Sequence, residues 1–407
     1  MQPNDTLFAC LNARLAPSLE LLRQMVAINS HTLNRDGVNQ LGRFTARAFA
    51  PLGFTAGFVP SANPALGDHL VLTRAGTGPR SVGFISHLDT VFPAEEEARN
   101  QFHWRVEGDR IYGPGTEDVK GGTVMMHLVL AALQTVAPDV FAATNWVLLL
   151  NASEETDSTE FGRLCEERLR GATAALVFEA GRRVGNEFSL VTARKGRAAF
   201  RIEVEGRGAH AGVAHTRGAS AIAQLAHTVQ RVEALTDPAR GLTVNVGTIT
   251  GGGALNRVPH RAVAEAELRA FSVEAYQAGL AQLRALEQEI TVRSRADGFP
   301  CRVRIILDHE SPPWPPNPRT EALLALYAAA GAELGLTVNR EERGGISDGN
   351  FICHAVPTLD GLGPMGDNAH CSERTADGSK DQEYVQPSSF VPKAALNVQA
   401  LLRLLRP

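Results

Sequence analysis

The chain has 407 residues, a length that corresponds to about two or three domains of ordinary size. Hydrophobic residues make up 44% and charged residues 21%, which excludes a disordered, collagen-like or disulfide-knot protein. The 40 basic and 44 acidic residues give a net charge of −4, so the chain lacks the positive field that recruits nucleic acid or an anionic membrane, and neither is expected as a partner.

Cysteine usage and the apolar stretches indicate a cytoplasmic protein. The five cysteines are scattered, and none forms a CxxC pair, which favours reduced thiols; the chemistry of Cys371 is left open. Charged residues interrupt the segment where a signal peptide needs an apolar run. The longest apolar stretches, such as Val124–Leu133, are too short to span a bilayer.

In chain order, helical spacing of apolar residues covers 8–26 and 37–52, and three short apolar runs follow. Nearly continuous apolar runs are typical of strands buried on both faces of a parallel sheet. Each run ends at residues that can bind a metal or move a proton: 81–86 at His87 and Asp89, 146–150 at Glu154 and Glu155, and 174–178 at Glu179. Because sites in open α/β sheets lie at the carboxyl ends of strands, we expect one shared cleft.

The middle of the chain changes to alternating apolar and polar residues, which is the pattern of a sheet with one solvated face. The expected strands are 197–205, 242–250, 262–271 and 301–308, and the expected helices are 217–235 and 273–295. A proline cluster at 312–318 marks a boundary, after which we expect a helix at 319–335, a strand at 357–359 and a helix at 388–405. The fold class is therefore α/β, with a mostly parallel-sheet catalytic domain (1–193 and 310–407) interrupted by an inserted α+β domain at 194–309.

Single motifs leave several interpretations open. Asp89 could fix the tautomer of a ligand His87, but HxD alone is weak. Asp118 sits at a glycine-rich junction between a loop and a helix, where an Asp can also act as a helix cap. The adjacent carboxylates Glu154 and Glu155 repel each other unless a solvated loop or a cation compensates.

Taken together, the candidate residues fit a pair of divalent cations. Two ions carry a charge of +4, which three carboxylates (Asp118, Glu155 and Glu179) and a bound hydroxide balance. Neutral His87 and His370 complete the ligand shells. A bridging Asp118 gives each ion three protein ligands and leaves room for a shared water. Glu154 then takes the proton of that water and passes it to the leaving amine.

Six segments in order resemble the dizinc metallopeptidase family that includes glutamate carboxypeptidase of the carboxypeptidase G type, aminoacylase, acetylornithine deacetylase, succinyl-diaminopimelate desuccinylase and tripeptidase T. The segments are SHLDTVFP (86–93), YGPGTEDVKGG (112–122), NASEETDS (151–158), FEAG (178–181), GRGAHAG (206–212) and GDNAHCSE (366–373). The resemblance extends over about residues 15–405, and it is closest to the glutamate carboxypeptidase type.

The resemblance implies the site assignments. One Zn²⁺ takes His87, Asp118 and Glu179, and the other takes Asp118, Glu155 and His370; Co²⁺ or Mn²⁺ could replace zinc. Asp89 orients His87, Glu154 is the catalytic base, and the Asp118–Val119 peptide matches a bond that is often cis in the family.

The same resemblance makes the inserted domain a ferredoxin-like lid through which the chain forms a homodimer. His210 then reaches the partner's active site and steadies the oxyanion. Asn256 and Arg269 match positions that bind the carbonyl and the carboxylate of the substrate, which is a small peptide or an N-acyl amino acid. Alternatively, His210 is a surface residue of the lid and Arg269 forms a salt bridge within it.

Three rival classes remain. Gly345–Gly349 is a formal GxSxG, which would make Ser347 the nucleophile of a serine hydrolase with Asp360 or Asp367 and His370, but no buried strand is expected before it. A nucleotide loop at Gly206 lacks its third glycine, since position 211 is Ala. A non-enzymatic binding protein would have lost a ligand or the base, whereas all these positions are filled.

The sequence therefore predicts a dinuclear zinc hydrolase that cleaves an amide bond next to a free carboxylate. The first expectation is a carboxypeptidase of the glutamate carboxypeptidase type. The alternative is an N-acyl amino acid deacylase, an aminoacylase, deacetylase or desuccinylase, that uses the same mechanism.

Overall fold

The computed structural model describes residues 3–406, which form two compact units. The first unit comprises the chain up to Thr192, Pro316–Glu342 and the chain from Ser347 onwards. The second unit comprises Ala193–Pro315 and Arg343–Ile346. Among the described residues, no helix is long and apolar enough to cross a membrane.

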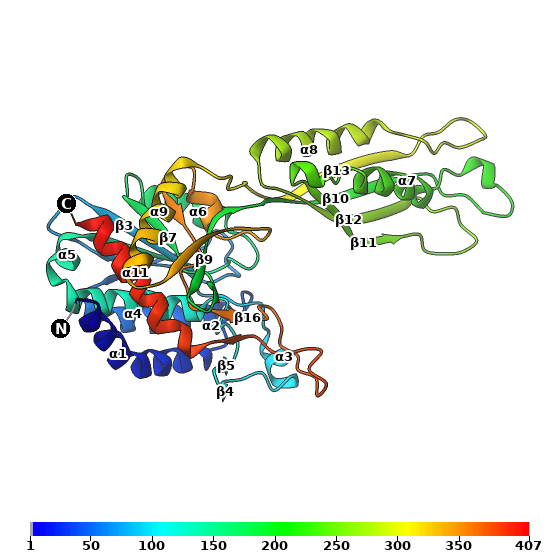
Figure 1. Ribbon diagram of the computed structural model, residues 1–407. Coiled ribbons are helices and arrows are strands. Elements are labelled where there is room, and N and C mark those ends of the chain that lie inside the picture. The colour runs from blue at the N-terminus through cyan, green and yellow to red at the C-terminus, as the bar shows by residue number, and fades with distance from the viewer. Residues whose placement is uncertain (1–2, 407) are drawn as a thin grey trace. The chain divides into compact units, whose positions relative to one another are not determined.

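A six-stranded sheet forms the centre of the first unit (Figure 1). Its strands, in spatial order, are β1 (Thr55–Val59), β2 (His69–Arg74), β6 (Asn145–Asn151), β3 (Ser81–His87), β7 (Ala174–Val177) and β15 (Thr358–Leu359). The pairs β6/β3, β3/β7 and β7/β15 are parallel, whereas β2 is antiparallel to both of its neighbours. The mostly parallel α/β sheet that the sequence predicts is thereby confirmed.

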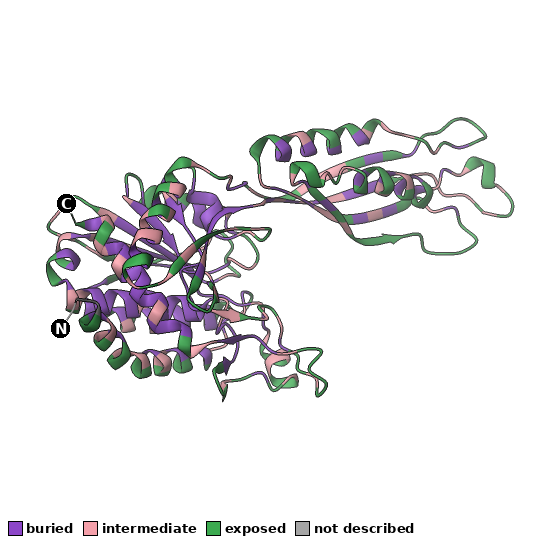
Figure 2. Ribbon diagram, viewed as in Figure 1, coloured by how far each residue is buried: buried purple, intermediate pink, exposed green. Residues whose placement is uncertain are grey.

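Both faces of this sheet are covered, which explains why its strands are almost continuously apolar. Alternate residues of one strand enter different cores: Phe84 joins the larger cluster, and Ile85 joins the smaller one behind it. The central strands β3, β6 and β7 are mostly buried, as Figure 2 shows, whereas the edge strand β1 is exposed. The helices α1 (Pro3–Val26), α4 (Lys120–Val136) and α11 (Phe390–Leu405) lie side by side on the larger cluster, together with α2 (Arg35–Phe49) and α9 (Pro318–Glu333). The opposite face packs against α6 (Thr159–Arg168) and α10 (Gly349–Ile352).

Among the described residues, the first unit also contains two small sheets and two further short α-helices. One sheet has the order β16 (Gly366–Asp367), β17 (Tyr384–Val385), β5 (Arg110–Tyr112) and β4 (Arg105–Glu107). The other has the order β14 (Thr337–Arg343), β9 (Glu187–Arg194) and β8 (Arg182–Val184). The short helices are α3 (Ala94–Arg99) and α5 (Pro138–Ala143).

The second unit is an antiparallel sheet with two helices on one face. Its strands, in spatial order, are β11 (Thr243–Gly251), β12 (Arg261–Ala270), β10 (Gly196–Glu205) and β13 (Arg302–Ser311). The helices α7 (Ala221–Glu233) and α8 (Val273–Ala285) share one apolar core with the inward residues of the strands. The alternating pattern of the sequence reflects this arrangement, because the other face carries charged side chains such as Arg201 and Glu265.

The predicted helix over 273–295 is too long, since α8 ends at Ala285 and a short 3₁₀ turn follows. The reason is a side-chain contact from the neighbouring helix. The buried amide of Gln224 accepts hydrogen bonds from the backbone N–H groups of Thr291 (2.9 Å) and Val292 (3.0 Å). These donors are therefore satisfied without helical bonding, and β-branched residues at these positions favour the extended form.

Candidate metal centre

The strands β6, β3 and β7 are adjacent and parallel, so their carboxyl ends meet at one edge of the sheet. His87 is the last residue of β3, Glu154 and Glu155 follow β6, and Glu179 follows β7. Asp118 arrives from the loop that precedes α4, and His370 from the loop between β16 and β17. Five elements thus deliver the predicted ligands to one place.

Two triads of potential ligands share Asp118. In the first, His87 Nε2 lies 2.9 Å from Asp118 Oδ1 and 3.8 Å from Glu179 Oε1. In the second, His370 Nε2 lies 3.3 Å from Asp118 Oδ2 and 3.1 Å from Glu155 Oε2. Each carboxylate oxygen of Asp118 therefore faces a different triad, as a bridging ligand requires.

The hydrogen bonds of His87 leave its Nε2 as the metal-binding atom. Its Nδ1 lies 3.0 Å from the backbone carbonyl of Asp89 and 3.5 Å from the Asp89 carboxylate. Both groups are acceptors, so neutral His87 carries its proton on Nδ1 and turns the Nε2 lone pair toward Asp118 and Glu179. The backbone oxygen of Asp89 therefore favours this tautomer together with the carboxylate, to which the sequence attributes it alone.

The carboxylate of Asp89 also holds the neighbouring strand end. Its oxygens accept hydrogen bonds from the backbone N–H groups of Glu154 (3.0 Å) and Glu155 (3.2 Å), and from the hydroxyl of Thr32 (2.7 Å). Asp89 and Thr32 are both buried. Asp89 therefore fixes the backbone of the two consecutive glutamates relative to β3.

Each triad contains two carboxylates, so a positive charge is needed at each to balance them. Oxygen Oε1 of Glu155 is buried without a hydrogen-bond partner. Hydrogen bonds to Asp118 and Glu155 raise the pKa of His370 to about 11. Burial opposes protonation of His87, but its bonds to Asp118 and Asp89 outweigh it and raise the pKa well above the usual range. Imidazolium ions can supply this charge, and so can divalent cations.

Divalent cations also match the spacing of the donor atoms. Zinc binds nitrogen and oxygen at about 2.0–2.2 Å, so two tetrahedral ligands of one ion lie roughly 3.3 Å apart. The histidine-to-carboxylate distances of 2.9–3.8 Å bracket this value. Imidazole and carboxylate are also the ligand types that such ions prefer. The residues present therefore fit a pair of ions that share Asp118.

Glu154 is set apart from the ligand groups by its surroundings. It belongs to neither triad. Burial raises the pKa of Glu154 well above the usual range; the positive charge of His87 opposes this effect, and the negative charge of Asp348 adds to it. A carboxyl group whose pKa is raised in this way is suited to both accepting and returning a proton.

The predicted residues of the second unit are arranged as follows. His210 Nδ1 accepts the backbone N–H groups of Gly212 and Val213, both at 3.2 Å, so neutral His210 carries its proton on Nε2. The carbonyl of Asn256 accepts the N–H of Ala211 at 2.8 Å, which places Asn256 beside the His210 loop. Both side chains are exposed.

Arg269 lies on β12 and already has a carboxylate partner. Its Nε and Nη2 donate to Glu267 at 2.8 and 3.1 Å, and its Nη1 donates to the carbonyl of Gly344 at 3.0 Å. The salt bridge within the inserted domain is therefore present. Two N–H groups of the guanidinium have no partner among these contacts, because the fork carries five donors. Its role toward a substrate stays a prediction.

The serine-hydrolase geometry is not formed at Ser347. This residue is 1% exposed, and its hydroxyl donates to Asp360 at 2.8 Å. The preceding strand β14 is mostly exposed, as the charged residues of the sequence suggest. His370 instead contacts Asp118 and Glu155.

Sequence reasoning missed three buried polar residues that support the site. Asn151 ends β6, and its amide donates to Asp348 Oδ1 and to Ser158 Oγ, both at 2.9 Å. Asp348 is 2% exposed, and Glu383 is fully buried. Asp348 falls within the glycine-rich loop that the sequence singles out, which is a usable signal. Glu383 has no such signal, since its partners lie far away in the sequence.

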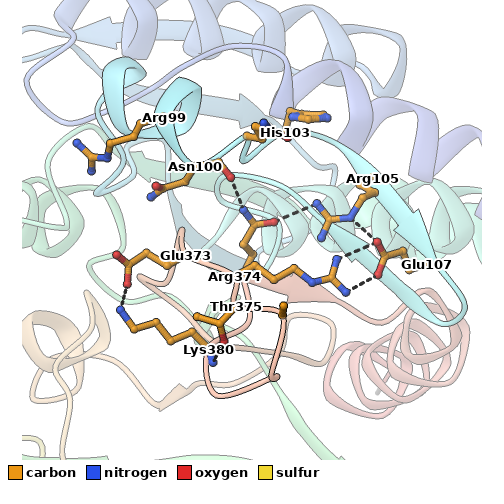
Figure 3. Close-up of a pocket in the computed structure, with 12 residues that line it drawn as sticks. Arg99, Asn100, His103, Arg105, Glu107, Glu373, Arg374, Thr375 and Lys380 are labelled. Carbon is orange, nitrogen blue, oxygen red and sulfur yellow. Dashed lines mark hydrogen bonds and ion pairs between the residues drawn. The ribbon is translucent and has the colours of Figure 1, made fainter.

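A roomy pocket of about 720 Å³ lies elsewhere on the first unit (Figure 3). None of the five candidate ligands lines it. It lies between the α3–β4 segment and the loop after His370, and several of its charged groups pair with one another. Arg374 binds both oxygens of Glu107 at 2.9 Å, and Lys380 pairs with Glu373. The candidate metal centre is therefore distinct from this pocket.

Comparisons with known proteins give a consistent picture. The family described as "Peptidase family M20/M25/M40" matches residues 83–395. Carboxypeptidase G2 of Pseudomonas sp. (strain RS-16) is 27% identical over 98% of this chain and 92% of its own length. Succinyl-diaminopimelate desuccinylase of Acidovorax ebreus (strain TPSY) is 26% identical over 88% of this chain and 92% of its own length.

Solved structures share the fold. Aminopeptidase PepT from Bacillus cereus ATCC 10987 superposes with a TM-score of 0.76 at 20% identity, covering 96% of this chain and 99% of that one. The YXEP protein of Bacillus subtilis, described as a dinuclear metal binding peptidase of the M20 family, gives 0.67 at 14% identity, covering 97% and 99%.

The fold and the family match define a class, that of the metallopeptidases and related amidohydrolases. Within that class, the chain belongs to peptidase family M20/M25/M40. It is an enzyme, a metal-dependent hydrolase, and the family resemblance that the sequence predicts is confirmed.

Proposed function

We propose that this enzyme is a dinuclear zinc carboxypeptidase of the glutamate carboxypeptidase type. The observation that carries the proposal is the pair of triads that share Asp118, one with His87 and Glu179 and the other with Glu155 and His370. The alignment with carboxypeptidase G2, which is 27% identical and covers 98% of the chain, favours this activity.

In the proposed mechanism, the residues of the two triads would hold two cations, which would supply a lowered pKa for a water molecule and polarisation of the scissile carbonyl. Glu154 accepts the proton of that water at its carboxylate and returns it to the leaving amine. Asp89 keeps Glu154 in place through the backbone N–H at 3.0 Å. In the homodimer that this proposal includes, His210 reaches the active site of the partner and donates its Nε2–H to the oxyanion that develops there. Its two backbone hydrogen bonds prepare the tautomer that this step needs.

Substrate binding uses residues of the second unit in this proposal. Arg269 pairs with the free carboxylate of the substrate through its remaining N–H groups, and Asn256 binds the carbonyl. Specificity for a carboxylate next to the cleaved bond follows from this pairing. The substrate is a small peptide or an N-acyl amino acid.

An N-acyl amino acid deacylase is the second candidate. The succinyl-diaminopimelate desuccinylase of Acidovorax ebreus is 26% identical over 88% of the chain, nearly the same identity as the carboxypeptidase. Both activities require the same metal centre and the same base, and they differ in the group that lies on the acyl side of the bond.

The deciding experiment compares the two substrate classes on zinc-loaded protein. Peptides that end in glutamate are tested beside N-acetyl and N-succinyl amino acids, and kcat/KM is measured for each. The proposal expects the glutamate peptides to be preferred and the activity to disappear with a chelator. Preference for N-acyl amino acids establishes the second candidate, and chelator-resistant hydrolysis rules out both.

A further inference from the structure

We propose that Glu383 is a positioning residue that holds two ligand loops, those of Asp118 and His370, in one fixed arrangement. The inference rests on the proposed function, because it treats Asp118 and His370 as metal ligands. Glu383 immediately precedes β17 and belongs to neither triad.

The side chain of Glu383 binds the backbone that carries the bridging carboxylate. Its Oε1 accepts the N–H of Glu117 at 2.9 Å and the N–H of Asp118 at 3.3 Å. The next peptide bond, between Asp118 and Val119, is cis. The helix α4 begins only at Lys120, so the N–H groups of Glu117 and Asp118 lie outside its hydrogen-bond pattern. Glu383 supplies their acceptor.

The backbone of Glu383 binds the loop of the other ligand. Its N–H donates to the carbonyl of Cys371, the residue after His370, at 2.8 Å. Its carbonyl accepts the N–H of Gly113 at 3.4 Å. One residue therefore joins the loop of Asp118 to the loop of His370, although the two ligands are far apart in the sequence.

The surroundings fix Glu383 itself. It is 0% exposed, and the preceding Gln382 is 2% exposed. The amide of Gln382 donates to the carbonyls of Asn100 and Ser372, both at 2.9 Å, and accepts from Arg105 at 3.0 Å. Arg374, nearer the start of the same loop, pairs with Glu107 at the end of β4, and Figure 3 shows this ion pair in the pocket.

A purely structural role explains these contacts poorly. Oxygen Oε2 of Glu383 is buried without a hydrogen-bond partner, and burying a carboxylate in this way costs folding free energy. In return, Oε1 accepts hydrogen bonds from the N–H groups of Glu117 and Asp118. Asp118 is the residue whose two carboxylate oxygens face the two triads. Residues that orient metal ligands in this way typically contribute about 10–100-fold in metal affinity or activity.

Two substitutions separate the reach of the side chain from its chemical type. Glu383→Gln keeps the length of the side chain and an acceptor oxygen, but replaces the acid by an amide. Glu383→Asp keeps the acid, but withdraws the acceptor by one methylene from Glu117 and Asp118. Glu373→Gln is the matched control, because Glu373 is an exposed carboxylate of the same loop that pairs with Lys380.

The experiment titrates metal-free protein with Zn²⁺ against a competing chelator and records the absorption spectrum of the Co²⁺-loaded form. Circular dichroism verifies that each variant is folded. We expect Glu383→Asp to bind zinc about 10–100-fold more weakly and to change the Co²⁺ spectrum. Glu383→Gln and the control are expected to stay close to the wild type.

Wild-type zinc affinity and an unchanged spectrum in Glu383→Asp overturn the inference, and so does a Glu383→Gln variant as weak as Glu383→Asp. A wild-type protein that binds fewer than two Zn²⁺ ions contradicts the proposed function instead. The failure of the positioning role and the failure of the metal centre therefore give different results.

Discussion

Single side chains of the site act through contacts that can be removed one at a time. Glu154 is the clearest case, because it belongs to neither triad while its backbone is tied to Asp89. Under the proposed function, replacing its carboxylate changes proton transfer and leaves the candidate ligands in place. This separation of roles makes catalysis and metal binding independently measurable.

We predict that Glu154→Gln lowers kcat by about 10²–10⁴-fold, the usual contribution of a general acid–base. The metal content is expected to stay unchanged, because Gln does not alter either triad. Steady-state kinetics with metal analysis checks both expectations, and Glu167→Gln, an exposed carboxylate on α6, is the control. Near-normal turnover in Glu154→Gln refutes its role as the base.

Asp348 allows a prediction about pH. Burial raises its pKa from 3.8 to about 7, although hydrogen bonds from Ser158 and Asn151 act in the opposite direction. Between these two values the folded state binds more protons than the unfolded chain, so the free energy of unfolding falls as the pH rises. Asp348→Asn removes this titration while its oxygen can still accept from Asn151.

The stability of Asp348→Asn relative to the wild type should therefore increase between about pH 5 and about pH 7. Urea unfolding of the metal-free proteins at several pH values measures this difference. A difference that stays constant across the range shows that Asp348 does not change its protonation state on unfolding in this window.

At the scale of elements, α4 must approach the end of β7 closely for Asp118 and Glu179 to share a triad. Gly122, in the first turn of α4, makes this approach possible. A Cβ at this position would lie 1.9 Å from the carbonyl oxygen of Phe178, the residue before Glu179. No side chain fits there unless the helix moves away from the strand.

We predict that Gly122→Ala destabilises the enzyme by about 1–3 kcal/mol, the usual cost of overpacking. It should also weaken metal binding, because the helix carries Asp118 away from Glu179. Gly42→Ala in α2 is the matched control, since its Cβ would meet only side-chain atoms at 3.4 Å. Alanine there should be neutral or stabilising by up to about 1 kcal/mol. Equal stabilities of the two variants in urea contradict the prediction.

The sequence predicted the elements whose signal is local. The strands β3, β6 and β7 are continuous apolar runs, and the candidate ligands follow directly after them. The prediction of a helix over 273–295 was wrong at its carboxyl end, because the hydrogen bond of Val292 to Gln224 involves a residue of another helix. Strands of two or three residues, such as β16, are too short for any periodicity.

The candidate site was also predictable only where its residues carry a local signal in the sequence. The ligand residues stand in recognisable motifs, whereas Glu383 acts on Asp118 through backbone groups that carry no residue type to recognise. The sequence assigns Asp89 to His87, and it carries no signal for the further hydrogen bonds that the Asp89 carboxylate accepts from the backbone N–H groups of Glu154 and Glu155. Hydrogen bonds to backbone groups leave little trace in one sequence.

For the whole molecule, each of the two units has its own hydrophobic core. All five candidate ligands belong to the first unit. Bound metal should therefore stabilise that unit selectively, by about 2.7 kcal/mol for each site at a free-metal concentration of 100 Kd.

We predict that chelator treatment lowers the melting temperature of one calorimetric transition and leaves a second transition in place. Zinc added back should restore the first. Differential scanning calorimetry of the chelated and restored protein makes the comparison. An equal shift of all transitions contradicts the assignment of the metals to the first unit alone.

The homodimer stays a prediction, and β11 is where we expect it. This strand lies at the end of its sheet, and Ile249 on it is 59% exposed. Free strand edges with apolar side chains pair readily with a second chain. Ile249→Lys should convert a dimer to a monomer in light scattering, and a wild type that is already monomeric contradicts the prediction.

The interruption of the first unit by the second has a consequence for biosynthesis. His87, Asp118, Glu155 and Glu179 all precede the inserted unit, whereas His370 and Glu383 follow it. A ribosome therefore releases all three candidate donors of one triad, and two of the three of the other, long before the imidazole of His370 emerges. A nascent chain at that stage can offer only one complete donor set, so occupancy of both positions must await the last quarter of translation.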